Sequence, residues 1–307
     1  MRLTLITILL LLISESVYSD DVRQKRIVLS YDDAPMSGTR YYSGEARTAQ
    51  LISSLREAKA GPVLFFVNTK GIEKLDKGMA RLKSYAKSGH LLANHTHSHL
   101  YAHKASVSDF LEDIDKAEAH LSTLPNNRPW VRFPYLDEGR FPEKIAQLAR
   151  GLASRGLSNG YVTVDTYDWY LNDLFQKALR DGKPINHDIL RDLYVRLSLE
   201  AAEHYDKISL STLGHSPIHV LLLHENDLAA LYAKDLVLAL RRAGWQIMHP
   251  DEAYKNPLPA PTTLHTSQGR LAALAIDKGM APKKTAHWSI IQTAIDNEIE
   301  TLGAFKK

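Results

Sequence analysis

Short apolar runs rich in β-branched and aromatic residues recur along the chain and alternate with longer, more polar stretches. Each run predicts a mostly buried strand, and the seven runs are Ile27–Tyr31, Val63–Val67, His90–Asn94, Trp130–Pro134, Tyr161–Asp165, His219–His224 and Trp245–His249. Most intervening stretches have helical spacing and helix end signals, namely Ser43–Ala60, Gly71–Ser88, Ser106–Leu124, Pro142–Arg155, Asn186–Tyr205 and Asn226–Ala243. This alternation predicts an α/β fold with a parallel sheet inside and helices outside, either open or closed into a barrel.

Residues 1–19 have the pattern of a secretory signal peptide. Arg2 precedes an apolar run, Leu3–Ile13, and the small residue Ser19 suits a signal-peptidase site. The alternative is a membrane anchor, but the run is shorter than the roughly 20 apolar residues that span a bilayer. We therefore expect an exported protein, periplasmic or secreted, without a membrane span after signal cleavage.

The rest of the chain is expected to form one main domain, residues 20–256, followed by an extension. A proline-rich stretch, Asn256–Pro261, marks the boundary, and one helical pattern, Ser289–Leu302, lies beyond it. Residues 257–307 are therefore expected to pack on the main domain. A long insertion, Tyr170–Pro217, separates the fifth and sixth predicted strands and is expected on the substrate side.

The composition restricts the chemistry. The 307 residues include no cysteine and fourteen histidines, so disulfides, thiolate nucleophiles and zinc sites built on sulfur are excluded. Any metal ligands must be His, Asp or Glu. Lys and Arg number 38 against 35 Asp and Glu, a balance too even to favour nucleic acid as the partner.

Polar residues follow the predicted strands at their carboxyl ends, where the loops of a parallel α/β fold converge. A lone His there is ordinarily a core residue, and a lone Asp is ordinarily a helix cap. Five of the seven strands, however, deliver an ionisable group to this edge, and burying such a set unpaired would cost several kcal/mol. A bound cation would explain the set, which comprises Asp32, Asp33, His95, His99, Arg132, Asp165 and His224, with Tyr135 beside them.

His95 and His99 are four residues apart, so on one helical turn both imidazoles would face the same way. With one carboxylate they would form a two-His, one-Asp site, which leaves coordination positions for water and substrate. His97 is an alternative ligand that would pair with either neighbour if the segment were extended.

Five segments resemble, in order, the motifs of the polysaccharide deacetylase family, carbohydrate esterase family four. They are Ser30–Pro35 (SYDDAP), His95–His99 (HTHSH), Arg132–Tyr135 (RFPY), Asp165–Trp169 (DTYDW) and Leu222–His224 (LLH). The resemblance covers roughly Ile27 to Tyr254. It implies a distorted (β/α)7 barrel, in agreement with the strand count, and an enzyme that deacetylates chitin, peptidoglycan or a similar glycan.

The resemblance also implies a metal centre. Asp33, His95 and His99 would hold a divalent ion, normally Zn²⁺, and Asp32 would be the general base toward the metal-bound water that attacks the acetyl carbonyl. Adjacent residues at a strand end point opposite ways, so Asp33 could bind the ion while Asp32 reaches the water.

Further residues acquire expected roles from the same resemblance. His224 would protonate the leaving sugar amine, with Asp165 as the carboxylate that favours its charged form. Arg132 would orient the base, and the Tyr135 backbone N–H would be an oxyanion donor. Trp169 and Leu222 would form an apolar slot for the acetyl methyl group, although ordinary core packing explains these two almost as well.

Other functions fit less well. Gly156–Gly160 matches a serine-hydrolase elbow in pattern, but a helix precedes it and a strand follows, the reverse of the required order. A non-catalytic glycan-binding protein would need neither a spare carboxylate nor a paired imidazole. A metal-dependent hydrolase of another amide or ester remains an alternative, because the motifs describe the acyl-transfer centre and not the sugar subsites. We predict a metal-dependent hydrolase that removes acetyl groups, N-linked or O-linked, from an acetylated polysaccharide or oligosaccharide.

Overall fold

The computed structural model describes residues 24–75, 77–261 and 267–305. The predicted signal peptide, residues 1–19, lies outside this part of the chain. Among the described residues, no helix combines the length and the apolar character needed to cross a bilayer.

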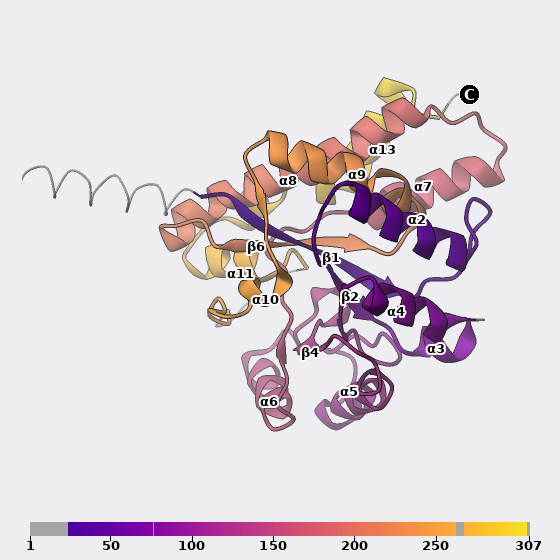
Figure 1. Ribbon diagram of the computed structural model, residues 1–307. Helices are drawn as coiled ribbons and strands as arrows, with labels where there is room; N and C mark the ends of the chain where they lie inside the picture. The colour runs from indigo at the N-terminus through magenta and orange to yellow at the C-terminus, as the bar shows by residue number, and fades with distance from the viewer. Residues whose placement is uncertain (1–23, 76, 262–266, 306–307) are drawn as a thin grey trace, which may run out of the picture.

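A seven-stranded parallel sheet forms the centre of the described chain (Figure 1). Its strands are β1 (Arg26–Ala34), β2 (Leu64–Val67), β3 (Leu91–Asn94), β4 (Asn127–Val131), β5 (Ser158–Asn159), β6 (Ile218–His224) and β7 (Gln246–Ile247). The order is β5-β4-β3-β2-β1-β6, and β7 pairs with the start of β1. After β5 the chain crosses to β6, where Val164 forms a parallel bridge with Leu221. The sheet therefore curls into the distorted barrel that the family resemblance implies.

Two strands differ most from their predicted positions. β4 ends at Val131 because Pro134–Leu136 form a 3₁₀ turn (η1), inside which Tyr135 has a left-handed backbone with φ of 60°. β5 is only Ser158–Asn159, and of the predicted strand Tyr161–Asp165 only Val164 forms a bridge. The chain switches partners here, from β4 to β6, so it cannot form a long ladder with either.

Helices surround the strands, with α2, α8 and α9 on one side and α5 and α6 on the other (Figure 1). The main-domain helices are α2 (Gly44–Glu57), α3 (Lys70–Lys74), α4 (Gly78–Lys87), α5 (Val107–Leu121), α6 (Pro142–Ala153), α7 (Asp168–Arg180), α8 (His187–Leu213), α9 (Asp227–Arg242) and α10 (Pro250–Ala253). The helix predicted over Gly71–Ser88 is two helices. At the break, a Cβ on Gly78 would lie 3.0 Å from the carbonyl oxygen of Gly71, so α3 and α4 approach closely.

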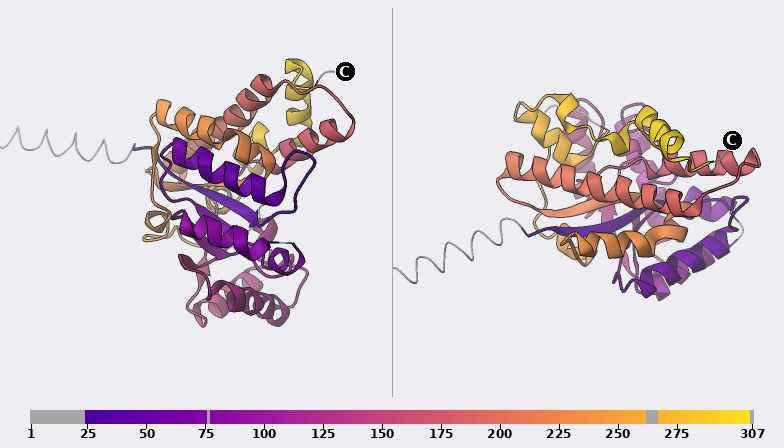
Figure 2. Two further views of the ribbon diagram at one scale, coloured as in Figure 1. Left: turned by 45° about the vertical axis from the view of Figure 1, so that its right-hand side comes forward. Right: turned by 90° about the horizontal axis from the view of Figure 1, so that it is seen from above.

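The insertion Tyr170–Pro217 holds most of α7 and all of α8. Behind α8 lie α11 (Arg270–Asp277), α12 (Pro282–Thr285), the 3₁₀ turn η2 (Trp288–Ile290) and α13 (Gln292–Leu302). The right-hand view of Figure 2 shows this C-terminal segment, in yellow, along α8. Leu271, Ala272 and Ile295 are fully buried in the same core as the strands, so the tail shares the core of the main domain.

The alternation of side chains along β1 positions the site. Ile27, Leu29 and Tyr31 are buried in the main hydrophobic core. Ser30 and Asp32 face the other side of the strand, where both contact Arg132. One face of β1 therefore packs in the main hydrophobic core, and the opposite face places the Asp32 carboxylate at the end of the strand.

Candidate active site

A cleft of about 900 Å³ opens at the carboxyl ends of the strands. Nine of the ten residues expected in the site line this cleft: Asp32, Asp33, His95, His99, Tyr135, Asp165, Trp169, Leu222 and His224. The tenth, Arg132, lies behind Asp32 and is 1% exposed. The tail contributes Gln268 and Ile276 to the cleft lining, and α7 contributes Asn172 and Asp173.

Asp33, His95 and His99 converge as a candidate metal site, with their ligand atoms all within 4.8 Å of one another. Oδ1 of Asp33 lies 3.2 Å from Nε2 of His99 and 3.6 Å from Nε2 of His95. Two donor atoms that bind one zinc ion at about 2.0–2.1 Å with tetrahedral angles lie about 3.3–3.4 Å apart. The spacing and the two-His, one-carboxylate donor set therefore fit a divalent ion such as zinc.

The backbone that brings these ligands together is not the one predicted. His95 and His99 lie in a loop and not on a helical turn, and Thr96 and His99 have positive φ values of 64° and 58°. These left-handed residues fold the loop so that both imidazoles reach Asp33. The ring of His97, the alternative ligand, contacts Thr69 and is absent from the Asp33 cluster.

Asp33 reaches the ligands through a β-bulge. Tyr31 pairs with Phe65 and Ala34 with Val67, so β1 has one extra residue between these pairs. Asp33 has a φ of 65°, and a bulge of this kind changes the direction of a side chain at the end of a strand. Simple alternation would have sent adjacent carboxylates to opposite faces, but here both lie beside His95.

Hydrogen bonding orients the buried His95. Its Nδ1 lies 2.9 Å from the carbonyl oxygen of Arg132, which leaves Nε2 facing the aspartates. Burial lowers the pKa of His95, only partly opposed by the charge of Asp32. A neutral imidazole with a free Nε2 lone pair is the form that binds a metal.

The Asp33 carboxylate is ionised. Burial alone would raise its pKa, but the hydrogen bond and charge of His99 outweigh burial and hold the pKa of Asp33 below its usual range. This is the protonation state that a metal ligand requires.

Asp32 is held by Arg132 at the base of the cleft. Nη1 of Arg132 donates to Oδ1 of Asp32 at 2.7 Å and to Oγ of Ser30 at 2.8 Å, and its Nε donates to the carbonyl oxygen of Gly160 at 2.8 Å. The guanidinium also lies 3.8 Å above the ring of Phe66. The second oxygen of Asp32, Oδ2, lies 3.7 Å from Nε2 of His95. One oxygen is thus fixed while the other faces the ligand set.

His224 pairs with Asp168, which corrects the expectation of Asp165. Nδ1 of His224 lies 2.7 Å from Oδ1 of Asp168, a carboxylate at the first position of α7. Burial by itself would lower the pKa of His224, but the charge and hydrogen bond of Asp168 outweigh it and raise the pKa to about 9. Asp165 lines the cleft nearby, and burial raises its pKa well above the usual value, with partial opposition from the charge of His224.

The sequence contained a signal for Asp168, because it lies in the same motif as Asp165 and at the start of a predicted insertion. The side chain that reaches His224 depends on where the helix begins. Since α7 begins at Asp168, this residue turns back toward β6, and its Oδ2 also accepts from the His224 amide.

Aromatic side chains line the cleft beside the candidate ligands. Tyr135 stacks on Tyr101 with ring centroids 3.7 Å apart, and it meets His99 edge-on at 4.5 Å. Tyr135 remains 45% exposed, as an aromatic ring at the mouth of a cleft would be. Trp169 and Leu222 lie in the same cleft lining.

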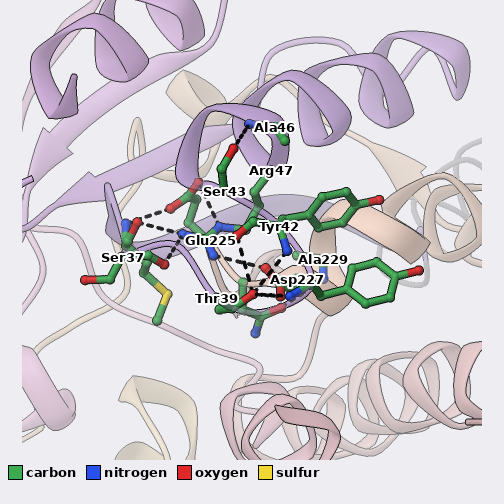
Figure 3. Close-up of polar contacts among 12 residues, drawn as sticks. Ser37, Thr39, Tyr42, Ser43, Ala46, Arg47, Glu225, Asp227 and Ala229 are labelled. Carbon is green, nitrogen blue, oxygen red and sulfur yellow. Dashed lines mark hydrogen bonds and ion pairs between the residues drawn. The ribbon is translucent and has the colours of Figure 1, made fainter. Parts of the chain in front are cut away.

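A buried ion network beneath the cleft was missed by sequence reasoning (Figure 3). Glu225 accepts from Arg81, from the Tyr85 hydroxyl at 2.8 Å and from the Met36 amide at 2.7 Å. Arg47 joins Glu225 to Asp227 and donates to the Met36 carbonyl. The network thus fixes the loop after β1, including Met36 of the cleft lining, to the end of β6.

The signal for this network was the unbroken polar run after the sixth strand, which continues from His224 through Asp227. Its two cationic partners come from the buried faces of α2 and α4. A single sequence does not reveal that arginines on two helices point inward.

Comparisons with known proteins agree with this architecture. A family model described as polysaccharide deacetylase matches residues 19–156. The peptidoglycan-N-acetylmuramic acid deacetylase PdaC of Bacillus subtilis is 28% identical over 212 residues, which are 67% of this chain and 40% of the relative. The chain therefore spans well under half the length of that curated relative.

Solved structures share the fold. The polysaccharide deacetylase Bc1974 from Bacillus cereus superposes with a TM-score of 0.55 at 17% identity, over 78% of this chain and 96% of that one. BA3943 from Bacillus anthracis, described as a pseudoenzyme of the CE4 family, gives a TM-score of 0.50 at 14% identity, over 73% of this chain and 63% of that one. By these sequence matches the chain is similar to the polysaccharide deacetylase family, and it shares the fold of the solved structures.

Proposed function

We propose that this protein is a metal-dependent hydrolase that removes acetyl groups from N-acetylated or O-acetylated sugars of a polysaccharide or oligosaccharide. One observation carries the proposal. The candidate metal ligands Asp33, His95 and His99 share a single cleft with an arginine-held carboxylate and a carboxylate-paired histidine. These are the groups that hydrolysis of an amide requires.

Asp33, His95 and His99 would hold the ion, and nitrogen and carboxylate donors of this kind suit Zn²⁺. When bound, such an ion polarises a carbonyl group and lowers the pKa of water to about 7. The ligands line a cleft of about 900 Å³, which would provide room for water and substrate.

Asp32 would act as the general base. Its Oδ1 is fixed by Arg132, so Oδ2 is the free acceptor, and it faces the ligand set. A water that attacks the acetyl carbonyl would transfer its proton to this oxygen. Arg132 would keep the carboxylate in position without occupying both of its oxygens.

His224 would act as the general acid. Asp168 occupies Nδ1, so Nε2 is the nitrogen left to face the cleft. As the carbon–nitrogen bond of the acetamide breaks, Nε2 would donate a proton to the sugar amine. The raised pKa of His224, about 9, keeps the imidazole protonated at neutral pH, as this role requires.

The remaining lining residues would position the substrate. The Tyr135 amide lies at a left-handed turn beside the cleft and would donate to the carbonyl oxygen as charge develops there. Trp169 and Leu222 would contact the acetyl methyl group. The aromatic pair of Tyr101 and Tyr135 offers a flat face of the kind on which a sugar ring can pack.

A non-catalytic glycan-binding protein of the same fold is the alternative, and a pseudoenzyme with this fold is known. The fold alone does not separate the two functions, but the side chains favour catalysis. Binding needs neither Asp32 held by Arg132 nor His224 charged by Asp168. The apolar leader expected at residues 1–19 supports export, which would bring the enzyme to periplasmic or extracellular glycans.

The test is acetate release from a panel of N-acetylglucosamine oligomers, peptidoglycan and O-acetylated glycans. Metal is first removed by chelation and then restored as Zn²⁺ or Co²⁺. The proposal expects release from at least one glycan that chelation abolishes and the metal restores. Acetate release that chelation does not change would exclude a role for the metal. If no glycan of the panel releases acetate, the non-catalytic glycan-binding function would be favoured.

A further inference from the structure

Three side chains of types that can bind a metal meet beside the loop that carries His95 and His99. Glu73 comes from α3, His97 from the loop itself and His120 from the last turn of α5. Their ligand atoms all lie within 4.8 Å of one another, and none of the three lines the cleft. The cluster is therefore separate from the candidate active site.

The carboxylate of Glu73 lies between the two imidazoles. Oε1 lies 3.2 Å from Nε2 of His120, and Oε2 lies 3.9 Å from Nε2 of His97. The two rings are almost parallel, at 9° with centroids 6.2 Å apart. Each imidazole thus presents its Nε2 edge to the same carboxylate, which gives a compact set of two nitrogens and one oxygen.

His97 is oriented by its surroundings. Oγ1 of Thr69 lies 3.0 Å from Nδ1, so Nε2 is the nitrogen that faces Glu73. The backbone is also fixed, because the Lys70 amide donates to the His97 carbonyl at 3.1 Å. A polar partner on the second nitrogen is the usual support of a metal-binding histidine. The His97 side chain is 16% exposed, whereas that of Glu73 is 52% exposed and can adjust.

We propose that Glu73, His97 and His120 form a second divalent-cation site, of the class that binds Zn²⁺. Two histidines and one carboxylate are a donor set for zinc and for similar transition metals. Donor atoms around one tetrahedral zinc lie about 3.3–3.4 Å apart, so the 3.9 Å pair must close by about half an ångström. Rotation of the half-exposed Glu73 side chain provides this movement.

The second site would tie three elements together. An ion there would join α3 and α5 to the loop between β3 and α5, and that loop also carries His95 and His99. His97, at the centre of the HTHSH segment, would then bind an ion outside the cleft, while His95 and His99 face the cleft. This inference does not depend on the chemistry proposed for the cleft.

The test counts bound zinc. Metal-free protein is titrated with ZnCl₂ in a calorimeter, and the metal retained after gel filtration is measured by mass spectrometry. We expect two zinc ions per chain for the wild type and one each for His120→Gln and Glu73→Gln. Asp33→Asn, which disrupts the cleft site, is also expected to retain one. His215→Gln replaces an exposed histidine outside both clusters and should still bind two.

Thermal stability provides an independent readout. Zinc should raise the melting temperature of Asp33→Asn, which keeps only the second site, and should not raise that of Asp33→Asn/His120→Gln. The site is refuted if Glu73→Gln and His120→Gln bind as much zinc as the wild type, or if zinc does not raise the melting temperature of Asp33→Asn. Because Glu73 is half-exposed, its substitution tests the site without endangering the fold. Failure of acetate release would count against the proposed function alone and would leave the zinc count unaffected.

Discussion

Asp168 holds His224 through both of its carboxylate oxygens. Oδ1 lies 2.7 Å from Nδ1 of the imidazole, and Oδ2 accepts from the His224 backbone amide at 3.0 Å. Oδ2 also accepts from the Asn226 side chain at 2.9 Å. One buried carboxylate therefore sets both the position and the charge of the histidine, and this relationship can be tested through the titration of His224.

Asp168→Asn should lower the pKa of His224 from about 9 to its ordinary value of 6.5 or below. Burial disfavours the charged imidazole, and the substitution removes the carboxylate that outweighs burial. The measurement is an NMR titration of the His224 ring in metal-free protein. Asp165→Asn is the matched control, since Asp165 is not the hydrogen-bonded partner, and it should move the pKa much less. A larger shift for Asp165→Asn would reverse the assignment.

The same pair predicts how stability depends on pH. The folded pKa of His224 is raised above its unfolded value, so the stabilisation is fully present below about pH 6.5 and is lost as pH rises through 9. The difference in unfolding free energy between wild type and Asp168→Asn should therefore shrink between pH 6 and pH 10. Urea unfolding across this range measures it, and a difference that grew with pH would contradict the pairing.

Arg132→Met should destabilise the protein by about 3–5 kcal/mol, because it leaves the buried Asp32 carboxylate without its partner. Arg132→Lys retains a charge but cannot reach Asp32, Ser30 and Gly160 together. Arg128→Met removes a partly exposed pair with Asp251 and is the control, with an expected loss of about 0–1 kcal/mol. Equal losses for Arg132→Met and Arg128→Met in urea unfolding would show that Arg132 is not a buried partner.

Glu225→Gln should also destabilise the protein by about 3–5 kcal/mol, since two buried arginines lose their common anion. Because Glu225 also holds the Met36 amide, substrate binding should weaken together with stability. Glu57→Gln, at an exposed ion pair with Lys234, should leave the unfolding midpoint unchanged. A Glu225→Gln protein as stable as the wild type would mean that the network contributes nothing to the fold.

Much of the architecture followed from periodicity. Each predicted apolar run corresponds to a strand or to the bridge at Val164, because burial on both faces requires apolar residues at every position. The end of a strand also indicated where chemistry gathers, and the spacing of His95 and His99 suggested a pair of ligands. The choice of Asp33 as the third ligand came from the resemblance of the motifs to a known family.

Local backbone geometry was not predictable in the same way. The bulge at Asp33 and the left-handed residues Thr96 and His99 depend on tertiary contacts, and none of these three is a glycine that would have indicated a positive φ. The choice of Asp168 over Asp165 depends on the residue at which α7 begins, and element boundaries are what single-sequence reasoning places least well. The helix α12 spans only four residues, too few for a periodic pattern to predict it.

The central claim is that the cleft hydrolyses acetylated sugars with Asp32 as base. The most direct measurement compares acetate release by wild-type and Asp32→Asn proteins, both with zinc restored and with equal zinc content at Asp33, His95 and His99. Loss of a positioned general base predicts a kcat about 10²–10⁴-fold lower with substrate binding retained. Turnover by Asp32→Asn at the wild-type rate would contradict this mechanism.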